Sequence, residues 1–383
     1  MAEIGILTAQ NQNRRRGQIH VYDGAGKGKS QAALGVVLRS IGLGIEEEVP
    51  SRVLLVRFLK GPGRDYAEDS AIAALQQGFP HLIDQLRTGR GDYFGPDQIT
   101  KFDKQEARRG WDVAKGAIAS GFYSVVVLDE LNPVLDLNLL PVSEVIEALR
   151  QKPDDMEVII TGRGAPPEVL SISDLHSEMR PVRHLDPTLN GTENGYLDQR
   201  PTGIEIYTGA GKGKSTSALG RALQAIGRGI SKDLSHRVLI IQWLKGGGGY
   251  TEDAAIRALR GSYPDLVDHQ RCGRDAIVWR GKQQEIDYVE AERGWELARA
   301  ALGSGLYKTI IMDELNPTVD LELLDSAPII EALLRKPKDT EIIITGRCHA
   351  PLPFFELASV HSEMVCHKHY ADRGADLKRG VDY

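Results

Sequence analysis

Cysteine is scarce in this chain: it has three cysteines, and all lie in the second half. A disulfide framework is therefore not expected, and a reducing compartment, the cytoplasm, is. No run reaches the roughly 18 apolar residues of a membrane span, and the N-terminus has no apolar signal core. The net charge of −6 does not favour nucleic acid. Neither a membrane nor a nucleic acid is expected as a partner.

A duplication is present instead. Residues at equivalent positions are 184 or 185 apart, far longer than a solenoid repeat of about 20–50 residues. The strings that occur twice are Gly-Ala-Gly-Lys-Gly-Lys-Ser (24–30, 209–215), Asp-Glu-Leu-Asn-Pro (129–133, 313–317), Ile-Ile-Thr-Gly-Arg (159–163, 343–347) and His-Ser-Glu-Met (176–179, 361–364). We predict two tandem domains, residues 1–184 and 203–383, joined by a linker at 185–202 that is rich in turn residues.

Each half alternates short apolar runs with longer helical patterns. In the first half we expect strands at residues 18–22, 53–58, 82–86, 123–128, 157–161 and 178–184, and helices at 29–41, 65–77, 98–120 and 142–151. Several strands are uninterrupted apolar runs, which is typical of strands covered on both faces. The order predicts an α/β fold with a parallel sheet and right-handed crossovers.

A glycine-rich turn between the first strand and first helix of each half predicts a phosphate site. Backbone amides in such a turn surround an anion at a helix N-terminus, and lysine and serine add a cation and a Mg²⁺ ligand. We therefore expect two P-loop NTPase (RecA-like) domains, each with a site for a nucleoside triphosphate. The nucleotide-binding candidates are Gly24, Ala25, Gly26, Lys27, Gly28, Lys29 and Ser30, and Gly209, Ala210, Gly211, Lys212, Gly213, Lys214, Ser215 and Thr216.

The first glycine of the standard loop pattern is missing from both copies. Asp23 takes its place in the first half and Thr208 in the second. A carboxylate beside a triphosphate repels it, so Asp23 either turns away or weakens the first site.

Acidic residues follow a buried strand in each half. Asp129 and Glu130 in the first half correspond to Asp313 and Glu314 in the second. Behind a phosphate loop, such acids are expected to hold Mg²⁺ (or Mn²⁺) together with the loop serine, directly or through water. The glutamate is a metal ligand or a base, and the alternative is a plain acidic turn. The metal-site candidates are Ser30, Asp129, Glu130, Ser215, Asp313 and Glu314, and the catalytic candidates are Lys29, Lys214, Glu130 and Glu314.

Basic residues follow other strands. Arg163 and Arg347 end an apolar strand, and their forked donors suit phosphate charge. Lys60 and Lys245 face a second substrate or are solvated loop charges, and the sequence leaves both open. The cysteines and histidines near the C-terminus match no standard zinc-finger spacing.

Taken together, these motifs resemble the phosphate-loop ATP:cob(I)alamin adenosyltransferases, also called cob(I)yrinic acid a,c-diamide adenosyltransferases. The Gly-Lys-Gly-Lys loop, the Leu-Asp-Glu-Leu strand end, Ile-Ile-Thr-Gly-Arg and the terminal Gly-Val-Asp-Tyr at 380–383 carry the likeness, which covers each half almost end to end. Members are commonly homodimers of single domains. The resemblance therefore implies a fused, pseudo-twofold pair; association into a larger homo-oligomer stays open.

The resemblance implies a reaction between ATP and a corrinoid. Reduced cobalt(I) attacks the 5′ carbon of the ATP ribose, and tripolyphosphate leaves. The protein then positions two substrates and stabilises the leaving charge. Lys29 and Lys214 would hold phosphates, and the loop serines with the strand-end acids would hold Mg²⁺.

One segment departs from the family pattern. Where members tend to carry an aromatic pair that packs on the corrinoid, this chain has Arg90 in residues 88–93 and Arg274 in residues 272–277. An ATP-binding switch or ATPase that has lost the corrinoid pocket is therefore the alternative. A phosphoryl-transfer kinase is a third hypothesis, but no separate arginine-rich lid segment is evident.

Overall fold

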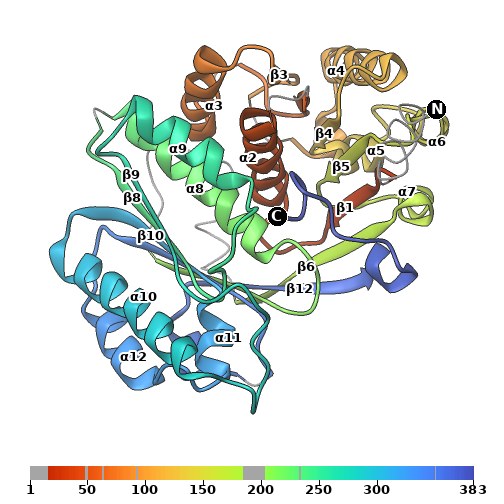
Figure 1. Cartoon of the computed structure of the whole chain (residues 1–383). Helices are drawn as coiled ribbons and strands as arrows, with labels where there is room; N and C mark the ends of the chain where they lie inside the picture. The colour runs from red at the N-terminus through yellow and green to blue at the C-terminus, as the bar shows by residue number, and fades with distance from the viewer. Residues whose placement is uncertain are drawn as a thin grey trace, which may run out of the picture.

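The computed structural model describes residues 16–47, 51–62, 64–91, 94–183, 203–232, 234–349 and 351–383. Its strands form one twelve-stranded sheet, ordered β3-β2-β4-β5-β1-β6-β12-β7-β11-β10-β8-β9. Figure 1 shows helices from both halves packed together in the middle of the molecule, with further helices outside them on either side. The predicted α/β fold, a mostly parallel sheet flanked by helices in each tandem copy, is confirmed.

The strands lie close to the predicted runs. They are β1 (Ile19–Asp23), β2 (Val53–Arg57), β3 (Ile83–Arg87), β4 (Val125–Asp129), β5 (Glu157–Thr161) and β6 (Leu175–Arg183), then β7 (Ile204–Thr208), β8 (Arg237–Gln242), β9 (Val267–Arg271), β10 (Tyr307–Asp313), β11 (Glu341–Thr345) and β12 (Val360–Lys368). Within each half all neighbours pair in parallel. Within each half the carboxyl ends of the strands therefore share one edge, where ligands of such sheets bind, and the two halves present these ends at opposite edges of the sheet.

Within the sheet, the halves meet through the antiparallel pair of β6 with β12. Met179 lies opposite Met364, which is the same position of the repeat. A residue that pairs with its own equivalent marks a twofold relation, as in an isologous dimer. Equivalent strands of the two halves thus pair with each other. The predicted linker at 185–202 lies outside the described residues, and the division into two domains stays a prediction.

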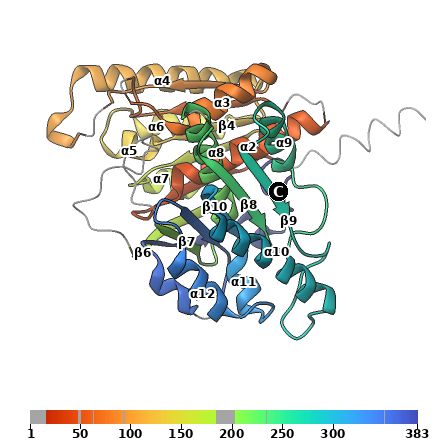
Figure 2. The same cartoon turned by 90° about the vertical axis from the view of Figure 1, so that its left-hand side faces the viewer.

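Helices cover both faces of the sheet. They are α2 (Lys29–Glu47), α3 (Ala67–Gly78), α4 (Lys101–Ser120), α5 (Leu131–Asp136), α6 (Val142–Arg150) and α7 (Pro167–Ile172), then α8 (Lys214–Ser231), α9 (Glu252–Ser262), α10 (Glu285–Ser304), α11 (Leu315–Asp320) and α12 (Ser326–Arg335). Figure 2 shows α4 and α6 at one end of the molecule and α10 to α12 at the other, with α2 and α8 between them. Among the described residues, no helix has the length and apolarity to cross a membrane.

Three apolar cores hold this arrangement together. One lies between the halves and joins α2 and α8 with Tyr22, Tyr207 and both pairing methionines. The other two lie on the outer faces, one in each half. Trp111 and Trp295, which the sequence assigns to core packing, are 0% and 5% exposed. The shared core makes the junction a structural unit in its own right.

A partly buried histidine predicts acid sensitivity of the second half. His236 contacts the Thr309 hydroxyl at 2.9 Å, and burial, with help from Arg228, lowers its pKa to about 4, against a raising effect of Glu341. Between pH 6.5 and 4 the unfolded chain therefore binds a proton that the folded chain does not, so stability falls as pH falls. We expect this histidine to lower the free energy of unfolding by about 1–2 kcal/mol between pH 6.5 and 5, after allowance for its partial exposure.

Urea unfolding at the two pH values measures this loss. The matched variant is His236→Ser, because the first half has Ser51 at the equivalent position. Its stability should depend less on pH than that of the unaltered chain. An identical pH dependence in the two proteins would show that groups other than His236 cause the acid sensitivity.

Candidate active site

Each phosphate loop joins a central strand to the first helix of its half, β1 to α2 and β7 to α8. The amide of Gly26 donates to the carbonyl of Met179 at 2.6 Å, and the amide of Gly211 donates to that of Met364 at 2.6 Å. The last glycine of each loop has a φ of +116° or +120°, which a side chain disfavours. Both loops are therefore tied to the two strands that join the halves.

The loop lysines lie inside their own loops. The ammonium of Lys29 donates to the carbonyl of Gly26 at 2.6 Å, and that of Lys214 donates to the carbonyl of Gly211 at 2.7 Å. Burial lowers the pKa of Lys214 to about 8. A bound anion would favour the charged form, so both ammonium groups stand where a polyphosphate would gain from them.

The strand-end aspartate of the first half is held by the side chains of Lys60 and Thr161. Lys60 donates to Asp129 Oδ2 at 2.5 Å and to the Ser30 hydroxyl at 3.3 Å. The Thr161 hydroxyl donates to Asp129 Oδ1 at 2.6 Å. Burial alone would raise the pKa of Asp129, but the Lys60 ammonium and these hydrogen bonds lower it. The group stays ionised next to the loop serine.

The second half repeats the arrangement. Lys245 donates to Asp313 Oδ2 at 2.5 Å, and the Thr345 hydroxyl donates to Oδ1 at 2.5 Å. Gln242 adds a third hydrogen bond at 3.0 Å. Against the effect of burial, Lys245 and the hydrogen bonds lower the pKa of Asp313 to about 2. Lys60 and Lys245, which the sequence left open, therefore contact the strand-end acids rather than solvent.

The adjacent glutamates have a strained backbone. Glu130 and Glu314 have φ values of +62° and +61°, which are uncommon for residues other than glycine. The backbone amides of these glutamates donate to the Thr161 and Thr345 hydroxyls at 3.0 Å, and these hydrogen bonds stabilise the conformation. The Ser215 hydroxyl donates to Glu314 at 3.3 Å, and burial, followed by Asp313, raises the pKa of Glu314. Loop serine, aspartate and glutamate are thus brought together.

The remaining loop residues differ between the halves. Arg347 is exposed and donates to the carbonyl of Ala210 at 2.8 Å, which places it on the second loop. Arg163 is also exposed, at the equivalent strand end. Asp23 Oδ1 accepts from the Ala165 amide at 3.5 Å, so this carboxylate is directed at the loop after β5.

Three nucleotide candidates contact the opposite half or the C-terminal segment. The Lys27 amide donates to the Ser362 hydroxyl at 3.1 Å. The Thr216 hydroxyl accepts from Arg39 of α2 at 3.1 Å. The Lys212 ammonium donates to the Tyr370 hydroxyl at 2.8 Å. Their side-chain or backbone contacts connect the loops to the junction.

In the segment where the family pattern has aromatic residues, an arginine of each half forms an ion pair with the following helix. Arg90 pairs with Asp103 at 3.0 Å and lies 4.0 Å from the centre of the Phe94 ring. Arg274 pairs with Asp287 at 2.7 Å. Each aspartate lies in the first turn of the following helix, α4 or α10. Tyr93 lies outside the described residues. Ile277 and Trp279 are 73% and 65% exposed, so this edge of the second half offers an apolar surface.

The oxygen ligands at the loop suit a divalent cation. The Lys60 ammonium already stands between the Ser30 hydroxyl and Asp129, which shows that these oxygens favour a cation. No three histidine, cysteine or acidic side chains gather to hold a metal within the described residues. Mg²⁺ that binds with a nucleotide needs only one or two carboxylates, because phosphates and water complete its shell. The donor set therefore fits Mg²⁺.

Two features of the site were not predicted from the sequence. The hydroxyls of Thr161 and Thr345 orient the strand-end acids, and the carbonyls of Met179 and Met364 hold the loops. Both pairs belong to repeated strings, and this recurrence was the available signal. No local pattern indicated what the side chains or carbonyls would contact.

Removal of the cation beside the strand-end acid should destabilise the fold. Lys245→Met would leave Asp313, which is 1% exposed, without its ion-pair partner. Loss of one member of a buried pair costs about 3–5 kcal/mol. Urea unfolding measures this cost. The control is Lys308→Met, which removes the exposed pair with Asp339 and should cost about 1 kcal/mol or less. Equal costs for the two variants would contradict a buried role for Lys245.

Comparisons with known proteins agree with this geometry. A model of the family described as ATP:corrinoid adenosyltransferase BtuR/CobO/CobP matches the chain twice, over residues 15–192 and 201–383. A protein of Nostoc sp., named only as uncharacterized, is 71% identical over 382 residues and 99% of both chains.

Single-copy relatives match about half of the chain. The corrinoid adenosyltransferase of Escherichia coli is 35% identical over 182 residues, which are 48% of this chain and 85% of that protein. The corrinoid adenosyltransferase CobA of Salmonella typhimurium is 35% identical over 181 residues, 47% of this chain and 85% of that protein. The chain therefore belongs to the ATP:corrinoid adenosyltransferase family and contains two copies of its domain.

Proposed function

We propose that this chain transfers the 5′-deoxyadenosyl group of ATP to the reduced cobalt(I) of a corrinoid and releases tripolyphosphate. The single observation that carries the proposal is the paired set of loops. In each, a lysine ammonium lies inside an amide-lined turn next to a serine and a strand-end acid. Membership of the family supports the two substrates, ATP and a corrinoid.

The reaction needs little covalent chemistry from the protein. A cobalt–carbon bond forms at the 5′ carbon of the ribose, and the bond from that carbon to the triphosphate oxygen breaks. The electron pair of the broken bond leaves with tripolyphosphate. The protein must therefore align the two substrates and stabilise the leaving charge.

The residues of each loop divide this work. Lys29 and Lys214, with the loop amides, would neutralise the phosphates, and Arg347 would add a forked donor at the second loop. Ser30 with Asp129 and Glu130, and Ser215 with Asp313 and Glu314, would hold Mg²⁺. When bound, that ion would neutralise phosphate charge. No general base is required, so the glutamates act on the metal or its water rather than on a proton of the substrate.

A second candidate function is an ATP-binding switch or ATPase. The ion pairs of Arg90 and Arg274 favour it, because they fill the segment where the family tends to pack aromatic residues on the corrinoid. Exposed Trp279, in the loop between β9 and α10, supports the transferase, since an exposed aromatic face suits a flat macrocycle.

An assay of the cobalt product separates the two functions. The chain is incubated with ATP, Mg²⁺ and chemically reduced cobalamin, and formation of the light-sensitive adenosylated product is followed by absorbance. The proposal expects this product from the unaltered chain and none from a Lys29→Ala/Lys214→Ala variant. ATP binding without any adenosylated product supports the switch, and release of orthophosphate alone supports the ATPase.

A further inference from the structure

The C-terminal segment, residues 369–383, folds over the opposite half of the molecule. It follows β12, passes through a short helix, η4 (Tyr370–Arg373), and ends beside α2 (Figure 1). The Ser40 hydroxyl of α2 donates to the carbonyl of Gly380 at 2.7 Å, and Arg39 donates to that of Val381 at 3.4 Å. The Thr251 hydroxyl of the second half donates to the carbonyl of Tyr383 at 3.0 Å. The segment is thus held by both halves.

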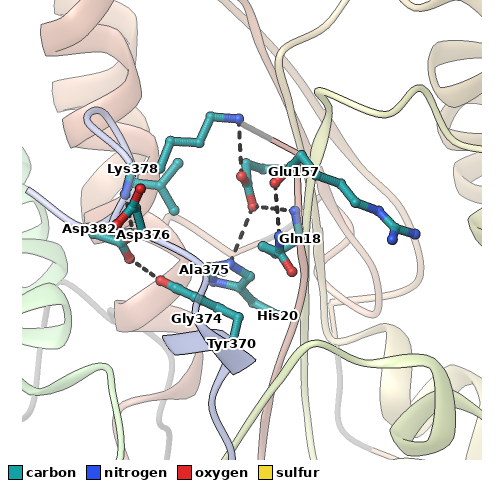
Figure 3. A pocket seen from close by; sticks show the side chains of 11 residues that line it. Gln18, His20, Glu157, Tyr370, Gly374, Ala375, Asp376, Lys378 and Asp382 are labelled. Atoms are coloured by element: carbon teal, nitrogen blue, oxygen red, sulfur yellow. Dashed lines mark hydrogen bonds and ion pairs between the residues drawn. The ribbon is translucent and has the colours of Figure 1, made fainter. Parts of the chain in front are cut away.

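A cavity of about 240 Å³, lined in part by charged side chains, lies beneath this segment. Figure 3 shows Glu157 in its wall, where it accepts from the Gln18 amide at 2.9 Å and pairs with Lys378 at 3.1 Å. Tyr370 and Asp382 line the same cavity and contact each other through the phenol hydroxyl and a carboxylate oxygen. Contacts around the cavity hold the segment against the first half, where Lys378 pairs with Glu157 of β5.

Lys212 of the second phosphate loop reaches into this contact. Its ammonium donates to the Tyr370 hydroxyl at 2.8 Å and pairs with the carboxylate of Asp382. The side chains of Lys212 and Asp382 are 11% and 3% exposed, so water screens the pair little. Lys212 stands between Gly211 and Gly213 in the loop, and its side chain is therefore held on the outside of the turn while Lys214 occupies the inside.

We propose that Asp382 and Tyr370 are positioning residues for the second nucleotide site. By holding Lys212 outward, they keep the loop backbone open for a polyphosphate and make that loop depend on the docked C-terminal segment. The inference rests on the proposed nucleotide site. It adds that the docked C-terminal segment controls nucleotide binding at the second loop.

Two physical points support a positioning role rather than an inhibitory one. The buried carboxylate would lose its cation if Lys212 turned toward a phosphate, and an uncompensated buried charge is costly. Burial lowers the pKa of Lys212 to about 7 against a raising effect of Glu157, so nearby carboxylates favour the charged ammonium. The pair is therefore most stable as it stands, with the loop fixed from outside.

The test isolates one loop at a time. In a Lys29→Ala chain, only the second loop binds ATP, and calorimetry with ATP and Mg²⁺ measures its affinity. We expect Asp382→Asn and Tyr370→Phe each to weaken this binding, the former about tenfold or more. Lys212→Met should weaken ATP binding to a similar extent. Addition of Asp382→Asn to Lys212→Met should weaken it little further, because the effects of substitutions at residues in contact are not additive.

Two controls match these variants. In a Lys214→Ala chain, where only the first loop binds, Asp382→Asn should leave the affinity unchanged. Arg379→Ala, which removes exposed pairs between the same segment and Glu46 and Glu47, should leave the second site unchanged. Urea unfolding of each variant verifies that the chain still folds, and Tyr370→Phe keeps the ring in place.

The outcomes separate this inference from the proposed function. Unchanged or tighter ATP binding by Asp382→Asn overturns the inference and leaves the transferase untouched. Weaker binding at the second loop alone, without any adenosylated product from the unaltered chain, supports the inference and rejects the transferase. Absence of ATP uptake by both single-loop chains contradicts both.

Discussion

Replacement of Lys29 and Lys214 by alanine is expected to remove the two nucleotide sites one at a time. Each ammonium lies inside its loop within 2.7 Å of a loop carbonyl, which places it against a bound polyphosphate. A charge-assisted contact to a transferring or leaving phosphate contributes roughly 10²–10³ in rate. Equilibrium dialysis should therefore find two ATP per unaltered chain, one per single variant and none for the double variant. Adenosyl transfer by the double variant should fall roughly 10³-fold.

The two single variants should not be equal. Asp23 stands at the first position of the first loop, and although its carboxylate is directed at the Ala165 amide, its charge remains close. Arg347 supports only the second loop in the contacts described above. We expect Lys214→Ala to remove the tighter of the two sites, so the site that remains in it should bind ATP more weakly than the site that remains in Lys29→Ala. Lys104→Ala, at an exposed position of α4, is the control and should bind as the unaltered chain. Equal losses would argue against an influence of Asp23.

Addition of a single methyl group at the junction of α2 and α8 should be strongly destabilising. A Cβ at Gly35 would lie 1.9 Å from the carbonyl oxygen of Thr216, and one at Gly220 would lie 1.9 Å from that of Gln31. Both neighbours are backbone atoms in helices and cannot yield, so the helices would have to separate. Overpacking of this kind costs about 3 kcal/mol. Urea unfolding of Gly35→Ala and Gly220→Ala measures the loss.

The same substitution elsewhere provides the control. Gly116 of α4 and Gly303 of α10 have no atom within 4 Å of a Cβ. Alanine is favoured over glycine in an open helical position by about 0.5–1 kcal/mol, so these variants should be neutral or more stable. Gln31 and Thr216 directly follow the loop serines, and Gly35→Ala should therefore also weaken ATP binding at both loops. Stability losses of the same size at junction and control positions would remove the steric explanation.

The secondary structure was best predicted where burial alone determines it. The run at 157–161 has the bounds of β5, because an uninterrupted apolar strand covered on both faces is visible in the sequence. The first helix was predicted to end at Ile41, but α2 continues to Glu47. Gly42 resembles a breaker in the sequence; in the structure it allows α2 to approach the carbonyl of Thr251. The six-residue helices α5 and α7 are too short to show a helical period.

The site was predicted as far as its local motifs extend. The loops and the strand-end acids are contiguous strings that need no knowledge of the fold. Lys60 reaches Asp129 because β2 lies beside β4 in the sheet, and that neighbourhood is a property of topology. Lys212 and Asp382 are 170 positions apart, and the path of the C-terminal segment after β12 brings them together.

Phosphorus NMR of the phosphate product is the most direct test of the central claim, that this doubled chain uses its loops for adenosyl transfer. The chain is incubated with ATP, Mg²⁺ and reduced cobalamin in the dark, and the products are compared with those of the Lys29→Ala/Lys214→Ala variant. We expect tripolyphosphate in equal amount to adenosylated corrinoid, and neither product from the variant. Orthophosphate or diphosphate as the sole product, or tripolyphosphate formed equally by the variant, would contradict it.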